Sequence, residues 1–419
     1  MSRVSGKEGL VIIAAILLLN VVFFAPMFSS PHSIGKSDWP AHQFLYEVAR
    51  QSLLVYRQIP LWNPYYCGGN VMLANPDCPA LSPFILLFAF FPTSLGLKII
   101  VLLHAAFGML GMYLLSREHG LNMRASILSA SVFVLNGAYI LHLGVGHIPI
   151  LHVSWLPFAL FFFMKCLKKQ PLSGRSWKTA LFAGLSALSL VLMLFEGGIE
   201  VFIFSCVLLF LFGFLQAIKK KEISALMCLA LVFLMVAVFG AVKLIPIYEL
   251  SLTDPHPAMF TDSVAPMTLY DMFLGKDQSA GRNAPYQKQG WWEYGAYIGH
   301  LAFLLFLIGL FANFRKQWHL ALLCVFFLFM FMGDTAPLNV WRLSQLLPGF
   351  SSLQTPARVR VVFLLIAGLL CGHGLSVIER MTVRKGEKKR LLSAVFSWFV
   401  VAMVLCSIFM VNRRIIGSG

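Results

Sequence analysis

Long runs of hydrophobic residues, separated by mostly short polar segments, dominate the chain. The runs are about 17–22 residues long, enough to cross a hydrocarbon core of roughly 30 Å at 1.5 Å per residue. They lack the polar and apolar alternation of membrane β-strands, so we expect helices. The predicted spans lie at residues 9–27, 95–115, 125–141, 149–165, 179–195, 199–218, 223–242, 295–313, 317–333, 359–378 and 391–411.

The composition agrees with a protein that resides in a bilayer. Hydrophobic residues make up 59% of the chain and charged residues 12%, whereas soluble domains carry about 25% charged residues. We therefore predict an all-α polytopic membrane protein with one domain, residues 1–419. Its first apolar run is longer than a signal peptide requires and precedes no A-x-A site, which favours an uncleaved anchor.

The net charge of +16 follows the predicted membrane topology. With the N-terminus inside, the inner segments hold 20 of the 33 Lys and Arg residues but 5 of the 17 acidic ones. This is the positive-inside pattern, so the basic excess implies no nucleic-acid partner. The C-terminus is then outside, and the long outer segments are 28–94, 243–294 and 334–357. We expect an integral, multi-pass protein, of a bacterial plasma membrane, with its active site on the exterior.

The first outer segment carries the strongest signals. Apolar residues recur at helical spacing over about 41–57, which predicts an amphipathic helix on the bilayer surface. The apolar stretch Leu81–Phe91 is too short to span and predicts a re-entrant or interfacial helix. Cys67 and Cys78 also lie here, where an oxidising compartment permits a disulfide.

Two acids of this segment are candidates for chemistry. Asp38 is either a general base that accepts a proton from an acceptor hydroxyl, or the N-cap of the surface helix; both roles are compatible. Asp77 is either a second acid or metal ligand, or a residue of an ordinary Asn75-Pro76-Asp77 turn; the turn is the favoured interpretation.

Other charged residues lie close to predicted membrane boundaries. Glu196 and Glu200 are four residues apart, which places them on one helix face that we expect to line a cavity; the alternative is a tight turn at the intervening glycines that leaves both solvated. Arg358 and Arg360 begin a span on the outer side, against the positive-inside trend. They predict a phosphate site, or else snorkelling to lipid headgroups.

The remaining candidates are histidine and aromatic residues. His147 lies in the outer turn between the third and fourth spans, either as a ligand of a sugar or phosphate or as a structural residue. Its spacing of five from His142 and from His152 does not favour zinc. Trp292 and Glu293 form either part of an aromatic belt at the interface or a surface that stacks on a sugar. The sequence has no Walker A, HExxH or G-x-S-x-G motif.

Several of these features together resemble polytopic glycosyltransferases of the GT-C type, and most of all bacterial membrane proteins of the YfhO type. The shared elements are these: Ser37-Asp38 after the first span, Ile59-Pro60-Leu61-Trp62-Asn63-Pro64, Gly68-Gly69, the prolines Pro79 and Pro83, Gly146-His147, and Thr355-Pro356-Ala357-Arg358. No second acid follows Asp38 within two residues, so no Asp-x-Asp-like metal pair is evident.

The resemblance implies a sugar donor linked to polyprenyl phosphate and an extracytoplasmic acceptor, which is a glycan, lipid or protein. It implies an inverting displacement with Asp38 as base, Arg358 and Arg360 on the departing phosphate, and Glu196 and His147 on sugar hydroxyls. No organic cofactor is expected, and the sequence leaves a divalent metal open without making one evident. Two rival functions remain: a flippase or transporter for lipid-linked sugars, and a non-catalytic membrane assembly subunit. Convergence of Asp38, Glu196 and Arg358 on one cavity would favour the enzyme.

Overall fold

The structure is a computed structural model of the 419-residue chain. It describes residues 6–29, 35, 37–168, 176–253, 262–282, 289–312, 314–347, 349–383 and 387–417. Within these ranges ten helical segments are long and apolar enough to cross a membrane, which makes the chain an integral multi-pass membrane protein. They are Gly9–Phe28, Thr93–Glu118, Met123–Val145, Ile148–Leu167, Trp177–Phe195, Ile199–Lys220, Ser224–Thr253, Phe314–Thr335, Pro356–Thr382 and Leu391–Ile416.

These spans agree with ten of the predicted ones, and the eleventh is shorter than predicted. The segment predicted at 295–313 forms a helix only over α12 (His300–Ala312), because the buried residues 295–299 before it are not helical. The long helices are α1 (Gly6–Phe24), α3 (Thr93–Glu118), α4 (Met123–Val134), α7 (Leu156–Leu167), α8 (Ser176–Phe195), α9 (Ile199–Lys220), α10 (Ser224–Thr253), α13 (Phe314–Met332), α15 (Arg360–Val383) and α16 (Glu387–Gly417).

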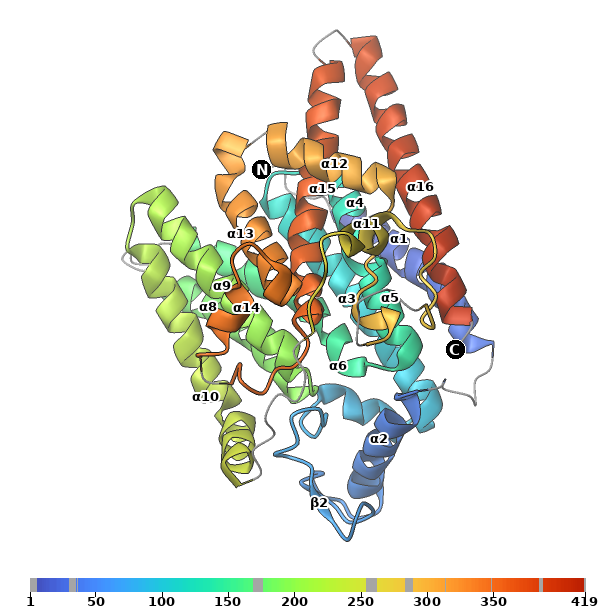
Figure 1. Cartoon of the computed structure of the whole chain (residues 1–419), viewed down its shortest axis with the longest axis vertical. Helices are drawn as coiled ribbons and strands as arrows, with labels where there is room; N and C mark the ends of the chain where they lie inside the picture. Colours follow the sequence, from blue (N-terminus) through green and yellow to red (C-terminus); the bar gives the residue numbers. More distant parts are fainter. Residues whose placement is uncertain are drawn as a thin grey trace.

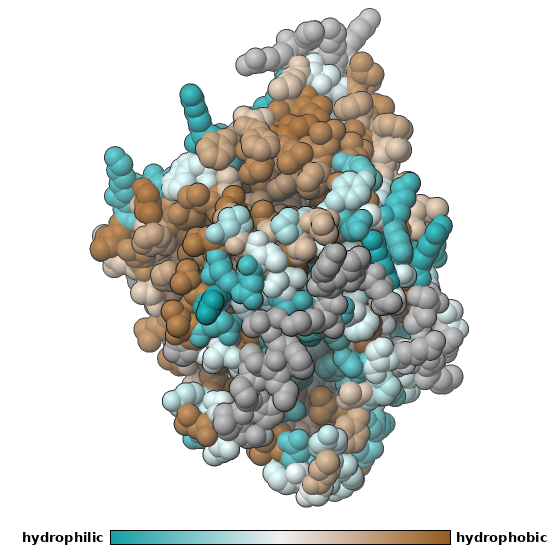
Figure 2. Space-filling view, in the orientation of Figure 1, coloured by the Kyte–Doolittle hydropathy of each residue, from teal (hydrophilic) through white to brown (hydrophobic). Residues whose placement is uncertain are grey.

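Helix α15 lies at the centre of the bundle. In the span that contains it, 89% of the best apolar window is buried inside the protein, against 28% in the spans of α1 and α16. Figure 1 shows α15 behind α12 and between α13 and α16, with α8, α9 and α10 grouped on the left. Apolar side chains gather over the upper part of this face in Figure 2, as expected where helices face lipid.

The first long segment forms a small layer at one end of the bundle, at the bottom of Figure 1. It contains α2 (Trp39–Leu54), a two-stranded ribbon of β1 (Trp62–Asn63) and β2 (Asn70–Val71), and the 3-10 helix η2 (Pro83–Ala89). The predicted amphipathic helix is therefore present, and the short apolar stretch forms a 3-10 helix. Cys67 is exposed and Cys78 buried, and both have free thiols.

Short helices also form in the later segments of the chain. They are α5 (Gly137–Val145), α6 (Ile148–Leu151), η3 (His152–Trp155), α11 (Thr268–Leu274), η4 (Trp291–Glu293), α14 (Val340–Ser344) and η6 (Pro356–Val359). Parts of the predicted 243–294 segment, at 254–261 and 283–288, lie outside the described residues. The turn between α5 and α6, together with η4 and η6, brings His147, Glu293 and Arg358 together near the start of α2.

Candidate functional site

Asp38 is held in place by the backbone around it. The Asp38 amide donates to the carbonyl of Val145, 3.0 Å away, and the Trp39 indole donates to the carbonyl of Leu143, also at 3.0 Å. Gly146 ends α5 at a φ of +84°, and a Cβ there would lie 2.5 Å from the Trp39 amide nitrogen. Only glycine permits both this conformation and this close approach. The start of α2 is therefore docked onto the turn that carries His147.

The Asp38 side chain occupies the N-cap position of α2 but makes no capping hydrogen bond. Its Oδ2 instead lies 2.9 Å from Nε2 of His147, and 55% of the side chain is exposed. Of the two roles predicted for Asp38, the capping role is thus not supported by a side-chain bond. The carboxylate is accessible to a ligand and contacts a histidine.

A directed series of hydrogen bonds fixes the proton on His147. The Arg360 guanidinium, which can only donate, lies 3.1 Å from Nε2 of His142, so this nitrogen is an acceptor. The proton of neutral His142 is then on Nδ1, which lies 3.0 Å from Nδ1 of His147. His147 accepts there, and its own proton is on Nε2, facing Asp38. Burial lowers the pKa of His147, and the charge of Arg358 adds to this shift. The charges of Glu293 and Asp38 oppose it. A neutral His147 at pH 7 agrees with this arrangement.

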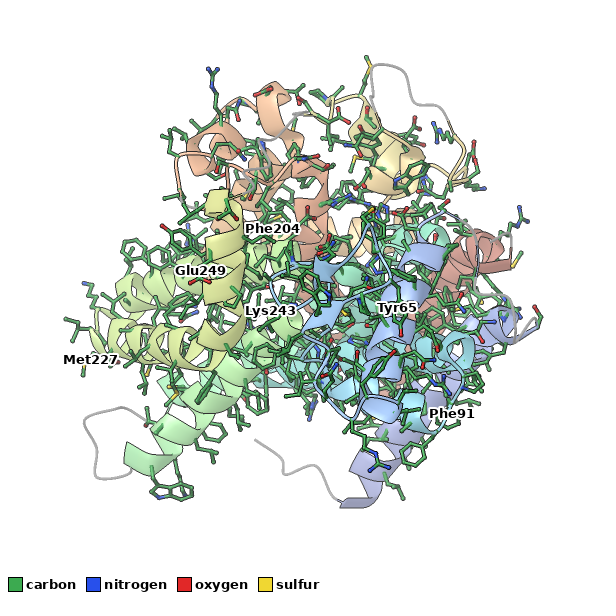
Figure 3. All side chains as sticks on the ribbon, turned by 90° about the horizontal axis from the view of Figure 1, so that it is seen from below. Tyr65, Phe91, Phe204, Met227, Lys243 and Glu249 are labelled. Carbon is green, nitrogen blue, oxygen red and sulfur yellow. The ribbon has the colours of Figure 1, made fainter. Side chains whose placement is uncertain are left out.

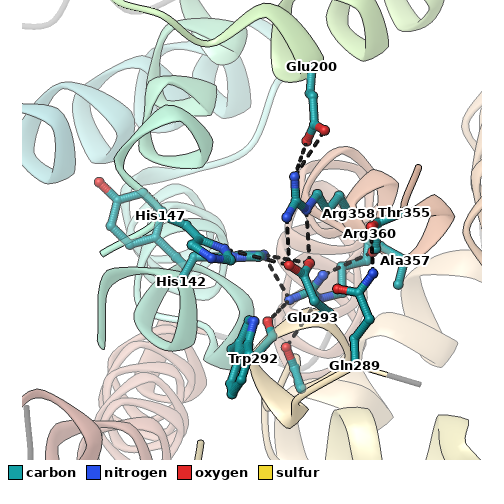
Figure 4. Close-up of polar contacts among 12 residues, drawn as sticks. His142, His147, Glu200, Gln289, Trp292, Glu293, Thr355, Ala357, Arg358 and Arg360 are labelled. Carbon is teal, nitrogen blue, oxygen red and sulfur yellow. Dashed lines mark hydrogen bonds and ion pairs between the residues drawn. The ribbon is translucent and has the colours of Figure 1, made fainter. Parts of the chain in front are cut away.

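Arg358 joins two carboxylates, as Figure 4 shows. Its Nε and Nη2 donate to the two oxygens of Glu293 at 3.0 and 2.7 Å, and its Nη1 lies 2.9 Å from both oxygens of Glu200. The Glu293 side chain is 1% exposed, whereas those of Glu200 and Arg358 are 22% and 25% exposed. Burial by itself raises the pKa of Glu293, but Arg358 outweighs it and holds that pKa below its usual value. The pair with Glu293 is therefore buried, and the pair with Glu200 is partly open.

Asp77 faces the same ion pair from the first segment. Its amide donates to the side chain of Asn75 at 3.0 Å, which confirms the predicted turn, and the residue keeps an exposed surface. Its backbone packs against the turn at Gly197, so protein atoms surround it on that side. This burial, together with the charge of Glu200, raises the pKa of Asp77 to about 6, while Arg358 and Lys243 oppose the shift. In Figure 3 Lys243 lies on the side of α10 that faces the first segment, and its ammonium donates to the carbonyl of Cys78.

Two predicted site residues are placed differently from expectation. Glu196 is buried and bonds to His104, with its Oε2 2.6 Å from His104 Nε2, so it is not part of the Arg358 cluster. The chain turns at Gly197, whose φ is +92°, so Glu196 and Glu200 do not share a helix face. The expected convergence of Asp38, Glu196 and Arg358 is therefore wrong for Glu196.

Arg360 is fully buried, and its guanidinium donates to the carbonyls of Trp292, Gly295 and Ala357 as well as to His142. It orients the histidine pair and does not present its charge to a phosphate, contrary to expectation. Trp292 is half-buried. Glu293 holds Arg358 and is not exposed for contact with a sugar.

Three potential metal ligands, one atom each of His142, His147 and Glu293, lie within 4.8 Å of one another. The sequence spacing of five led us not to expect zinc here, yet the turn at Gly146 brings the two imidazoles to 3.0 Å. The charges around them do not fit a dication, because the Glu293 carboxylate is already paired with Arg358 and His142 accepts from Arg360. These residues form a hydrogen-bonded network of protein groups.

Sequence reasoning missed His104 and His42, and it named His152 only as a neighbour of His147. His104 and His152 are buried beside Glu196, and His42 lies one helical turn after Asp38 on α2. Burial lowers the pKa of His42 to about 4, so it is neutral at pH 7. His104 had a detectable signal, since an ionisable residue in the middle of an apolar run is a functional candidate by default.

Comparison with solved structures shows the fold. The chain aligns over 99% of its length with the oligosaccharyltransferase AglB from Archaeoglobus fulgidus, solved with an inhibitory peptide and a dolichol-phosphate, with a TM-score of 0.56 and 12% identity. It aligns over 96% of its length with the arabinofuranosyltransferase AftD from Mycobacteria, with a TM-score of 0.57 and 13% identity.

The fold is GT-C-like, similar to that of these two transferases. The chain spans 56% of the length of the AglB chain and 27% of the AftD chain. No family model and no curated protein sequence matches it. The likeness is therefore one of architecture, and the chemistry has to be argued from the residues of this chain.

Proposed function

We propose that the protein is a membrane glycosyltransferase that moves a sugar from a polyprenyl-phosphate donor to an extracytoplasmic acceptor. The observation that carries the proposal is an accessible carboxylate, Asp38, fixed beside the Arg358 ion pairs on a GT-C fold. The solved complex of AglB with a dolichol-phosphate supports a lipid-phosphate donor. Within the GT-C class, the motifs of the first segment favour the YfhO type.

In the proposed reaction Asp38 accepts the proton of the acceptor hydroxyl. The acceptor oxygen forms a bond to the anomeric carbon as the bond from that carbon to the phosphate oxygen breaks, and the electron pair leaves with the lipid phosphate. Attack from the face opposite the phosphate inverts the configuration. The N–H of His147 faces Oδ2 of Asp38 and so fixes the orientation of the carboxylate, which leaves Oδ1 to accept the proton.

Arg358 is the residue that we assign to the donor phosphate. Its partner Glu293 is buried and held by two bonds, but Glu200 is 22% exposed and free to turn toward solvent. A donor phosphate can therefore replace Glu200 while Glu293 keeps the guanidinium in place. Guanidinium binds phosphate oxygens in the same forked geometry as a carboxylate, so the exchange preserves the hydrogen bonds.

The charge pattern supports an exterior site. In the orientation given by the positive-inside rule, the end of the bundle that carries α2 faces outside. Lipid-linked donors present their sugars on that side, in keeping with an acceptor in the cell envelope.

The test is sugar transfer by the purified full chain with synthetic polyprenyl-phosphate sugars that carry a radiolabelled sugar. General-base catalysis contributes about 10²–10⁴-fold, so Asp38→Asn is expected to lose at least about 100-fold in rate while the donor still binds. Glu249→Gln is the matched control, because Glu249 is an exposed acid at the same end of the molecule (Figure 3). Transfer by Asp38→Asn at the wild-type rate would exclude Asp38 as the base.

A further inference from the structure

A second cluster of potential metal ligands is buried beside the candidate site. His104 on α3, His152 on η3 and Glu196 at the end of α8 offer one ligand atom each, all within 4.8 Å of one another. The side chains are each 1% exposed. Three residues so far apart in the sequence meet here because the turn after α8 packs against both α3 and η3.

His152 is the residue that hydrogen bonding inside the protein does not explain. Neither of its ring nitrogens has a hydrogen-bond partner, although the residue is 1% exposed. Buried polar groups in folded proteins nearly always have a partner, and an exception requires an explanation. Oε2 of Glu196 lies 3.7 Å from Nδ1 of His152, which is too far for a hydrogen bond.

The other two ligands are arranged as metal ligands usually are. Nδ1 of His104 lies 2.9 Å from the carbonyl of Ile100, which fixes its proton there and directs Nε2 toward Glu196. The Trp155 indole N–H donates to both oxygens of Glu196, at 3.3 and 3.2 Å. A backbone carbonyl behind a histidine and a donor behind a carboxylate are the outer partners that orient ligands in metal sites.

The distances fit a small tetrahedral cation. Oε2 of Glu196 lies 2.6 Å from Nε2 of His104 and 3.7 Å from Nδ1 of His152. Ligand atoms about 2.0–2.1 Å from zinc lie roughly 3.3 Å apart in a tetrahedron. The two distances bracket this value, so shifts of well under 1 Å in two side chains would create the site.

We propose that His104, His152 and Glu196 bind one first-row divalent cation of the zinc type, with water in the fourth position. Two imidazoles and one carboxylate form a ligand set that zinc takes readily. Unlike the cluster around His147, no arginine pairs with this carboxylate in the described part of the chain. The nearby Lys243 donates to the carbonyl of Cys78. The ion would hold the turn between α8 and α9 against α3 and η3. It would thereby also fix the position of Glu200 at the start of α9.

The first measurement is zinc content of the purified full chain after incubation with Zn²⁺ and gel filtration. We expect about one zinc per chain in the wild type and in His147→Ala, and none above background in His152→Ala. Because His152 makes no hydrogen bond, its loss leaves no partner unsatisfied, so the variant is expected to fold. Trp155→Phe removes a donor to Glu196 and is expected to weaken zinc binding by about 10–100-fold.

A second measurement keeps the result independent of folding and of sugar transfer. Zn²⁺ is expected to raise the melting temperature of the wild type and of His147→Ala, but not that of His152→Ala. Co²⁺ in place of zinc is expected to give the visible absorption of a four-coordinate ion. A wild type that binds no zinc, or zinc that is lost in His147→Ala and kept in His152→Ala, would overturn the proposal.

Discussion

Removing Arg358 is predicted to cost more stability than removing either of the carboxylates that it holds. In Arg358→Met, Glu293 is left as a buried carboxylate without the cation that makes two hydrogen bonds to it. Breaking a buried ion pair by removing one partner costs about 3–5 kcal/mol. Glu200 is 22% exposed and can turn toward water, so losing the Arg358–Glu200 pair costs about 1 kcal/mol of stability or less.

The single acid variants are expected to be milder for a structural reason. Glu293→Gln leaves Arg358 paired with Glu200, and hydrogen bonds to charged groups are worth about 1.5–3 kcal/mol. The double variant Arg358→Met with Glu293→Gln leaves no buried unpaired charge. Its cost is therefore expected to be clearly smaller than the sum of the two single costs.

The assay is thermal unfolding of the purified protein in detergent, followed by tryptophan fluorescence. Extending the size scaling of melting temperatures to a chain of this length gives about 1–2 °C per kcal/mol, so Arg358→Met is expected to melt roughly 3–10 °C lower. Arg50→Met is the control, since the Arg50–Glu47 pair is solvated, with side chains 34% and 39% exposed. Equal shifts for Arg50→Met and Arg358→Met, or strict additivity in the double variant, would refute the reasoning.

Two further predictions concern the first segment. Burial, with the charge of Glu200, raises the pKa of Asp77 to about 6, so the folded state takes up this proton before the unfolded chain does as the pH falls. Lowering the pH from about 7 to about 5 should thus stabilise the wild type relative to Asp77→Asn; equal melting shifts for both proteins would contradict this. Cys67 is exposed and Cys78 is buried. A membrane-impermeant maleimide should therefore label Cys67 in intact cells, and the Cys67→Ser variant should lose this labelling. Labelling that requires permeabilised cells would reverse the proposed orientation.

The membrane helices were predictable because their signal is local. Length and hydropathy alone identify a span, and ten spans agree with the structure. The exception, α12 (His300–Ala312), shows the limit of that signal. The preceding residues 295–299 are mostly apolar, yet they form a buried segment that is not helical. Hydropathy reports burial in an apolar environment and does not distinguish a helix from a packed loop.

The candidate site was predictable as a set of residues but not as a set of contacts. The charged residues named at apolar boundaries include Glu200, Glu293 and Arg358, which the structure joins by ion pairs. Arg360 carries the same signal, yet it is buried against backbone carbonyls. The packing of η4 (Trp291–Glu293) decides which arginine pairs with a carboxylate and which binds backbone carbonyls. No pattern within the sequence of η6 and α15 contains that information.

Gly197 connects the two clusters, and its replacement provides a test of how the site is assembled. The residue has a φ of +92°, and a Cβ there would lie 2.4 Å from the carbonyl oxygen of Asp77. The turn between Glu196 and Glu200 thus lies directly against the backbone of the first segment. Gly68 also has a positive φ, +81°, but a Cβ there would meet nothing within 4 Å.

Gly197→Ala and Gly68→Ala therefore both force alanine into a left-handed backbone conformation. Only Gly197→Ala also brings a Cβ too close to a neighbouring atom. A left-handed conformation costs an L-residue about 1–2 kcal/mol, which we expect for Gly68→Ala. Forcing an extra carbon into a packed contact adds about 1–3 kcal/mol, so Gly197→Ala should be less stable than Gly68→Ala by that amount in thermal unfolding. If the clash instead pushes the first segment away, Gly197→Ala should also lose sugar transfer, because that segment carries Asp38, the proposed base. Equal stability and equal transfer in both variants would show that the first segment does not depend on this turn for its position.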